Sequence, residues 1–499
     1  MNQGLQEYDP LDYDDGFDDD TVNVGFSSSI ECLLAITIDA FRNIITVMLM
    51  VNIVTKLLLQ FKFLQKEFFV NAIFILSGLS LVFYHFGANN LILPVHFILF
   101  VMIGLVIVNF FHNNQILWVY CLACISLNEM TIKFLNSDHI RLRVFFMSST
   151  MKLLALHAWI QKTRDHEKSF HDSIIPRMIS FLFHPSGLPF CGYSPPRLDK
   201  SPEDWAKSQF LLKSLFAFCK SILYLGLSDC VLIFLNDYLL DSIHLILIQY
   251  FPLELCHFLD TCLNCYFIAL QFRCSHYFVC FLIQSSHQFW GNDLTVAKPS
   301  MIEFPRSLVD VVIAWDIPMH KWLKEHVFMP AKSRWGFLQS VMVTYMASSY
   351  IHGFRFEIWS VLLSLGIFTW IETRLRSLLA STFEACIGAK SCKYQPNFGS
   401  MTSLWKMIRM KIGLVPLDSF PKCDHDHKNT PFNSICVLIS NLVFSLIAVV
   451  HLAYLGASFD LSEEASTVRY VIETWQNIGF YSHILGLVTL IIYFIIRPW

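Results

Sequence analysis

Long charge-free runs dominate the pattern of hydrophobic and polar positions along this chain. No Asp, Glu, Lys or Arg occurs in four stretches, 68–128, 335–354, 429–459 and 474–496. A helix that crosses a bilayer needs about 20 mostly apolar residues, whereas a helix on a soluble protein carries polar residues on its outer face. The pattern therefore predicts an all-α protein that crosses a membrane many times.

Apolar stretches of spanning length recur along most of the sequence, and we expect about ten to twelve spans. They fit residues 43–61, 69–87, 91–111, 115–134, 145–161, 209–228, 229–252, 262–288, 336–353, 356–372, 432–457 and 476–497. Residues 27–42 carry three charges and are typical of a helix in the membrane interface. The apolar middle of 162–208 is short and interrupted by Gly and Pro, which indicates a re-entrant segment.

Two polar segments predict how the chain is organised and oriented. The first 20 residues hold eight acids and no base, so we expect a disordered acidic tail over 1–25 and a single membrane domain over 26–499. The loop 387–431 holds seven bases and three acids. Because cytoplasmic loops favour Lys and Arg, we expect this loop in the cytosol and the N-terminus in the lumen.

The composition agrees with a membrane protein and excludes other classes. Of 499 residues, 55% are hydrophobic and 15% charged, against about 25% charged in average soluble domains. The chain has 36 Lys and Arg against 39 Asp and Glu, so it lacks the basic surplus of a nucleic-acid-binding protein.

Many of the 15 Cys lie in apolar runs, where Cys behaves as a small hydrophobic residue. Cys386, Cys392 and Cys423, in or beside the cytosolic loop, have no standard zinc spacing. Palmitoylation is an alternative for Cys386 or Cys392. A reduced loop without metal is the simplest expectation.

Two ionisable residues beside apolar sequence are candidates for chemistry. His352 ends a charge-free stretch, and Asp316 lies in Ile-Ala-Trp-Asp-Ile-Pro. An ionisable group at membrane depth is costly and therefore a functional candidate, and a neutral His can act as a base. Each has a simpler explanation. The chain holds 19 His, of which most would be packed, and Asp316 would cap a helix before Pro318.

Residues 289–354 form a polar segment followed by an apolar one that resembles the signature region of the membrane-bound O-acyltransferases. The similar pieces are Asp293–Pro299, Pro305–Ser307, Trp315–Met319, Val343–Ser349, His352–Phe354 and, later, His451–Gly456. They cover 280–460 well, whereas the first 260 residues are similar only in hydropathy. Pro299, Pro305, Pro318 and Pro330 are expected to break 289–335 into short helices.

The resemblance implies that the chain folds as the family's helical bundle and uses acyl-CoA as co-substrate, with no other cofactor. It implies a buried histidine, whose position His352 takes, and a nearby Asn or Asp, whose position Asp316 takes. The similar proteins commonly carry Asn there. The pieces are most similar to the members that acylate Wnt proteins, which implies transfer of a palmitoleoyl group from palmitoleoyl-CoA to a Wnt serine in the endoplasmic reticulum membrane.

Acyl transfer to an alcohol needs a base for the hydroxyl group and donors for the oxyanion. We expect His352 to take the serine proton in a polar tunnel open to both membrane faces, and Asp316 to orient the histidine or the thioester. The alternative activity is transfer to a small lipid such as a lysophospholipid. A transporter is disfavoured because no internal repeat is visible.

Other residues of the segment are candidates for substrate contacts. Arg306 and Lys298 suit the phosphates of CoA, although they would also fit ordinary cytosolic charges. Trp315 would line the acyl channel, or simply pack. Tyr345 and Ser349 lie near His352 at helical spacing and would donate to the acceptor or the oxyanion, with helix packing as the alternative.

Overall fold

Every regular element that the structure describes is helical. The computed structural model describes residues 31–32, 34–41, 45–86, 91–135, 138–163, 171–188, 211–236, 238, 249, 252–383, 385–390, 431–459 and 468–497. Over these residues the expected all-α fold is confirmed. The acidic tail 1–25 and residues 391–430 of the expected cytosolic loop lie outside them, as do residues 164–170 and 189–208 of the expected re-entrant segment.

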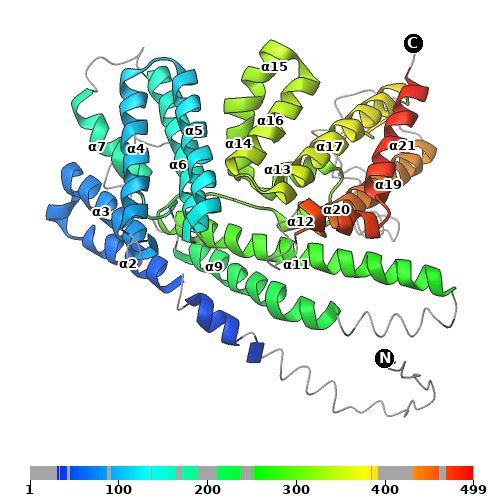
Figure 1. The fold of residues 1–499 in the computed structure, drawn as a ribbon, viewed down its shortest axis with the longest axis horizontal. Helices are drawn as coiled ribbons and strands as arrows, with labels where there is room; N and C mark the ends of the chain where they lie inside the picture. The colour runs from blue at the N-terminus through cyan, green and yellow to red at the C-terminus, as the bar shows by residue number, and fades with distance from the viewer. Residues whose placement is uncertain are drawn as a thin grey trace, which may run out of the picture.

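The elements fall into three groups along the chain (Figure 1). The first comprises α2 (Thr46–Leu58), η2 (Lys62–Gln65), α3 (Glu67–Phe86), α4 (Ile92–Phe110), α5 (Asn114–Leu135), α6 (Asp138–Thr163) and α7 (His171–Leu182). The second comprises α9 (Leu211–Gly226), η3 (Leu227–Val231), α11 (Leu253–Phe289), α12 (Pro299–Glu303), α13 (Leu308–Trp315), α14 (Ile317–Leu323), η4 (Lys324–Phe328), α15 (Met329–Trp335), α16 (Phe337–Ile351) and α17 (Phe356–Thr382). The third comprises α19 (Pro431–Gly456), α20 (Val468–Asn477) and α21 (Tyr481–Ile496).

A helix occupies each predicted span except 229–252, much of which lies outside the described residues. Six helices among the described residues are long and apolar enough to cross a membrane, or seven if α20 and α21 form one span bent by 71°. This count is below ten to twelve in part because α2 and α16 have only 13 and 15 residues, and because much of 229–252 lies outside the described residues.

Pro299, Pro305 and Pro318 divide the first part of the polar segment 289–335 into short helices, as expected. Pro330 does not, because α14, η4 and α15 follow one another without a break over residues 317–335. Pro299 and Pro318 lie in the first turns of α12 and α14, where a missing N–H costs no hydrogen bond. Gly336, at a φ of +85°, ends α15 and begins α16. The chain can reverse there because glycine has no Cβ to oppose a positive φ.

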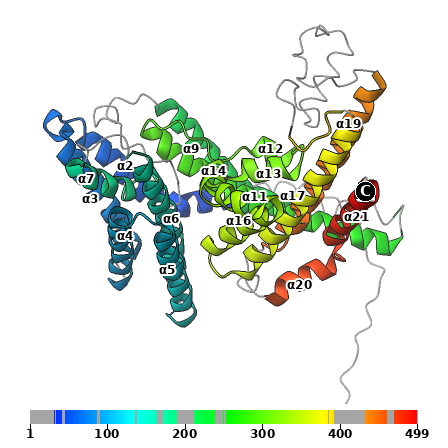
Figure 2. The ribbon, with the colours of Figure 1, turned by 90° about the horizontal axis from the view of Figure 1, so that it is seen from above.

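The first group of helices and the third group lie on opposite sides of the second group, which forms a central layer (Figures 1 and 2). The 37-residue helix α11 packs against both α9 and α19. The core of the N-terminal bundle also takes in Met319, Trp322 and Ile351 from the central layer, and Trp322 Nε1 donates to the carbonyl of Met151 at 3.1 Å. His352, directly after Ile351, therefore lies at the boundary between these two parts.

A disulfide joins Cys32 to Cys230, which the sequence did not reveal. It ties the N-terminal helical residues to η3, the turn that follows α9. Both cysteines border apolar sequence, so neither spacing nor hydropathy separates them from the cysteines that only fill the core.

Candidate active site

His352 lies in the turn between α16 and α17. Its backbone N–H donates to the carbonyl of Ser348 at 3.2 Å, which closes α16, and Gly353 follows at a φ of +93°. The side chain is partly buried, and no described residue hydrogen-bonds its imidazole. An imidazole that is positioned but not engaged is able to exchange a proton with a substrate.

Asp316 begins α14, and its carboxylate accepts the backbone N–H of Met319 at 2.9 Å. The capping role weighed from the sequence is therefore confirmed. The neighbouring backbone pairs with the segment before α12: Ile317 N–H donates to the carbonyl of Val296 at 2.8 Å, and Lys298 N–H donates to that of Ala314 at 3.0 Å. Two pieces of the signature region are thus joined beside the carboxylate.

His276 of α11 connects the neighbourhoods of His352 and Asp316, and the sequence analysis missed it. Its Nε2 lies 3.0 Å from the carbonyl oxygen of Trp315, and its ring stacks on the Trp315 indole at 4.3 Å. It also interacts electrostatically with His352. Its position in a long apolar helix is the signal that would have marked it, by the same argument that marked His352.

Burial raises the pKa of Asp316 to about 6, against the cap hydrogen bond from Met319, which lowers it. Asp316 as a whole residue is half-buried, and its carboxylate interacts electrostatically with Cys280 of α11. Asp316 is therefore mostly ionised at neutral pH. In that state it accepts hydrogen bonds but cannot donate one.

The other aromatic and hydroxyl candidates lie in contacts that also explain them as packing residues. Trp315 stacks on His276 and on Phe272. Tyr345 packs so closely on Gly366 that a Cβ there would lie 2.7 Å from its ring. Ser349 is fully buried and donates to the carbonyl of Tyr345 at 2.9 Å. Their roles as substrate contacts stay predictions.

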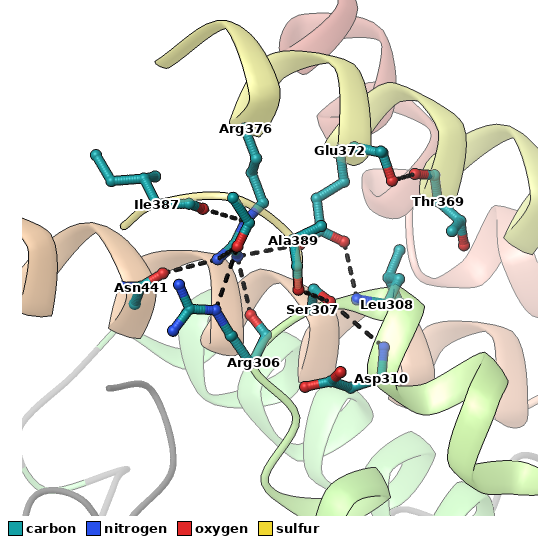
Figure 3. A network of polar contacts seen from close by, with 12 residues as sticks. Arg306, Ser307, Leu308, Asp310, Thr369, Glu372, Arg376, Ile387, Ala389 and Asn441 are labelled. Atoms are coloured by element: carbon teal, nitrogen blue, oxygen red, sulfur yellow. Dashed lines mark hydrogen bonds and ion pairs between the residues drawn. The ribbon is translucent and has the colours of Figure 1, made fainter. Parts of the chain in front are cut away.

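Arg306 lies in a buried polar network between α13, α17, α19 and the loop 385–390 (Figure 3). Its guanidinium donates to the carbonyls of Gly388 at 3.2 Å and Cys386 at 2.6 Å. Arg376 donates to Glu372, to Asn441 and to the carbonyls of Arg306, Ile387 and Gly388. These contacts give Arg306 a structural role, and its expected binding of CoA phosphate stays a prediction.

The same network fixes the start of α13. The Glu372 carboxylate accepts the N–H of Leu308 at 2.8 Å, and the hydroxyl of Ser307 donates to the carbonyl of Ala389 at 2.9 Å. At 1.5 Å per residue, the stretch of α17 from Phe356 to Glu372 is about 24 Å long. The network and the His352 turn therefore lie far apart along α17, at separate sites.

Lys298 and Cys386 differ in exposure. Lys298 is exposed beside α12, so its ammonium is available to an anion.

Cys386 is buried, at 7% exposure, and its carbonyl accepts from Arg306 and Asn441. Burial disfavours the palmitoylation considered for Cys386, whereas Cys392 and Cys423 lie outside the described residues.

Comparison with known proteins finds a matching family model and several similar sequences. Residues 198–393 match the model of the membrane-bound O-acyltransferase (MBOAT) family. The chain is 34% identical over 240 residues to the protein-serine O-palmitoleoyltransferase porcupine of Homo sapiens (44% of this chain, 45% of the relative). It is 30% identical over 249 residues to that of Anopheles gambiae (46% and 44%) and 29% over 297 residues to that of Drosophila melanogaster (55% and 49%).

The chain spans about half the length of the curated relatives that it matches. The matched segment holds Asp316, His352 and Arg306, whereas α2–α7 lie before it. The resemblance inferred from the signature pieces is thereby confirmed: residues 198–393 are similar to the membrane-bound O-acyltransferase family.

Proposed function

We propose that this protein transfers a mono-unsaturated fatty acyl group, palmitoleoyl, from acyl-CoA to a serine hydroxyl of a Wnt protein in the endoplasmic reticulum membrane. The proposal is supported by the relatives, which are named as protein-serine O-palmitoleoyltransferases. It is also supported by the apolar helices, which suit an enzyme whose acyl substrate partitions into lipid.

The observation that carries the proposal is the unengaged imidazole of His352, at the junction of α6, α11 and α16. It removes the proton from the acceptor serine while the serine Oγ attacks the thioester carbonyl carbon. The C–S bond then breaks, CoA leaves as a thiolate, and the proton passes from His352 to the leaving sulfur. Each step uses only the two substrates and one proton carrier.

Asp316 supports the site by holding the start of α14, and with it the Trp315 carbonyl that contacts His276. An Asn at this position would keep the cap, because both side chains accept the N–H at the helix start. The departure from Asn is therefore compatible with the same reaction. Lys298, exposed on the side expected to face the cytosol, remains the candidate for a CoA phosphate.

Incubation of the purified protein with labelled palmitoleoyl-CoA and either a Wnt-derived serine peptide or a lysophospholipid tests the proposal. We expect label on the peptide serine, and we expect His352→Ala to remove it without lowering the amount of folded protein. Glu325→Gln, which removes an exposed partner of Lys162, is the control and should label normally. Label on the lysophospholipid alone would replace the protein acceptor with a lipid one, and labelling by His352→Ala at the normal rate would refute the role of the histidine.

A further inference from the structure

The turn that carries His352 rests on a buried ion pair from the N-terminal bundle. Glu129 of α5 is 4% exposed, and Arg143 of α6 donates to its two carboxylate oxygens at 2.5 and 2.7 Å. This two-pronged geometry is the strongest arrangement of an arginine and a carboxylate. Neither residue lies in the segment that matches the family model.

The pair contacts the backbone of the turn directly. The Glu129 carboxylate also accepts the N–H of Phe354 at 3.1 Å. A Cβ on Gly353 would lie 2.6 Å from Arg143 Nε and 2.7 Å from Glu129 Oε1, so the absence of a side chain lets the turn approach. From the other side, Trp359 Nε1 donates to the Gly353 carbonyl at 2.9 Å.

The pair also sets the charge around the imidazole. Among the described residues, the titratable and charged groups that act on His352 are His276 of α11 and Arg143 of α6, and Arg143 is paired with Glu129 of α5. A buried charge is costly unless it is paired, and ionisable groups inside a membrane protein are retained mainly for function. Packing alone therefore does not explain why two such groups lie against the turn that carries His352.

We infer that Glu129 and Arg143 are positioning residues for His352: Glu129 holds the turn through Phe354 and neutralises Arg143, so that the imidazole stays placed for proton transfer. The inference rests on the proposed function for its catalytic consequence, but its structural content is independent of acyl transfer. Arg143 without its carboxylate would repel a proton on the imidazole.

The pH dependence of His352 modification by diethyl pyrocarbonate, followed by mass spectrometry, tests this without any turnover. The reagent attacks the neutral imidazole, so the midpoint of labelling reports its protonation. In Glu129→Gln we expect the midpoint to move about one pH unit lower, because a cation within a few ångströms shifts a neighbouring group by about this much. In Glu129→Gln/Arg143→Met, which removes both charges, the midpoint should return to that of the wild type.

A midpoint that stays at the wild-type value in Glu129→Gln would overturn the inference, and so would a double variant that keeps the midpoint of the single one. Glu325→Gln, an exposed partner of Lys162, is the matched control and should leave the midpoint unchanged.

Activity adds a second readout. Glu129→Gln should lower kcat for acyl transfer about 10- to 100-fold, because small misplacements of a catalytic group have effects of this size, with KM for acyl-CoA little changed.

If Glu129→Gln does not fold, Glu129→Asp keeps the charge but shortens the reach to Phe354, and it should lower kcat at an unchanged midpoint of labelling. Wild-type kcat in Glu129→Asp would then reject the positioning role. An inactive wild type with the expected midpoint shifts would refute the proposed function alone.

Discussion

At the scale of single residues, the sequence located the candidate site but not all of its members. His352 and Asp316 were identifiable because each stands out from apolar sequence, and the alternative of a helix cap for Asp316 was visible from Pro318. His276, Glu129 and Arg143 were not found, because their importance depends on which helices meet at the turn. Hydropathy along the chain does not encode those contacts.

Replacement of Asp316 should separate its two properties, the cap of helix α14 and the buried carboxyl group. Asp316→Ala loses the hydrogen bond to Met319 and should destabilise the protein by about 1 kcal/mol, the usual cost of losing a helix N-cap. Asp316→Asn keeps a cap without a charge and should be at least as stable as the wild type at pH 7.5. Thermal unfolding in detergent measures both changes.

The pH dependence of that comparison follows from the raised pKa of Asp316, about 6 in the folded protein against 3.8 as the ordinary value. The native state holds its proton to higher pH than the unfolded chain, so this group makes stability fall as the pH rises from about 4 to 6. The advantage of Asp316→Asn should accordingly be larger at pH 7.5 than at pH 4.5. An equal difference at both values would show that the carboxylate is not buried.

Gly353→Ala tests how closely the turn is packed. The new Cβ would meet Arg143 and Glu129 at 2.6 and 2.7 Å, at a φ of +93°. We expect loss of acyl transfer together with a lower unfolding temperature, because a residue with a side chain is strained in this conformation and must displace the ion pair. Gly388→Ala is the control, since a Cβ there would meet only ordinary contact at 3.7 Å. Wild-type behaviour of Gly353→Ala would mean that the pair and the turn are not in contact.

At the scale of elements, the sequence predicted helices well and their connections less well. Most spans and the proline-divided helices follow from hydropathy and backbone chemistry, which are local properties. The network around Arg376 is not local, since it joins α17 both to the start of α13 and to the loop 385–390. The guanidinium of Arg306, which the sequence suggested for CoA phosphate, donates to the backbone carbonyls of Gly388 and Cys386, and its binding of phosphate stays a prediction.

Glu372→Gln should show what that network contributes to folding. Arg376 is completely buried, and removal of one partner of a buried ion pair costs about 3–5 kcal/mol. We expect a large fall in the unfolding temperature in detergent. Glu473→Gln breaks the exposed pair with Arg469 and should change it little. Similar unfolding temperatures for the two variants would contradict the buried network.

At the scale of the whole molecule, contacts bring three segments of the chain to one end of the bundle. Lys56 donates to the carbonyl of Phe289 at 2.6 Å, and Lys213 pairs with Asp293 at 2.9 Å. The first loop, the start of α9 and the end of α11 therefore share one end of the bundle, the one that its basic residues assign to the cytosol. Residues 1–25 and 391–430 lie outside the described structure, so their expected sides remain predictions.

The disulfide offers a test of this orientation. Disulfides persist in the oxidising lumen and are rare in the cytosol, so Cys32 and Cys230 should lie on the lumenal side, at the other end of α9 from Lys213. Peptide mapping of protein from intact microsomes, alkylated without reduction, should recover the two cysteines as a linked pair. A membrane-impermeant thiol reagent applied from the cytosolic side should not reach them even after reduction. Labelling from that side would invert the assignment.

The central claim, that His352 carries the proton in acyl transfer, is tested most directly by single-turnover kinetics. Purified wild type and His352→Ala would be loaded with palmitoleoyl-CoA, mixed with excess serine peptide and followed for acylated peptide, with acyl-CoA affinity measured separately. If His352 is the general base, we expect a rate constant lower by about 10²- to 10⁴-fold in His352→Ala, the usual contribution of such a base, at unchanged affinity for acyl-CoA. A rate constant within a few-fold of the wild type would contradict it.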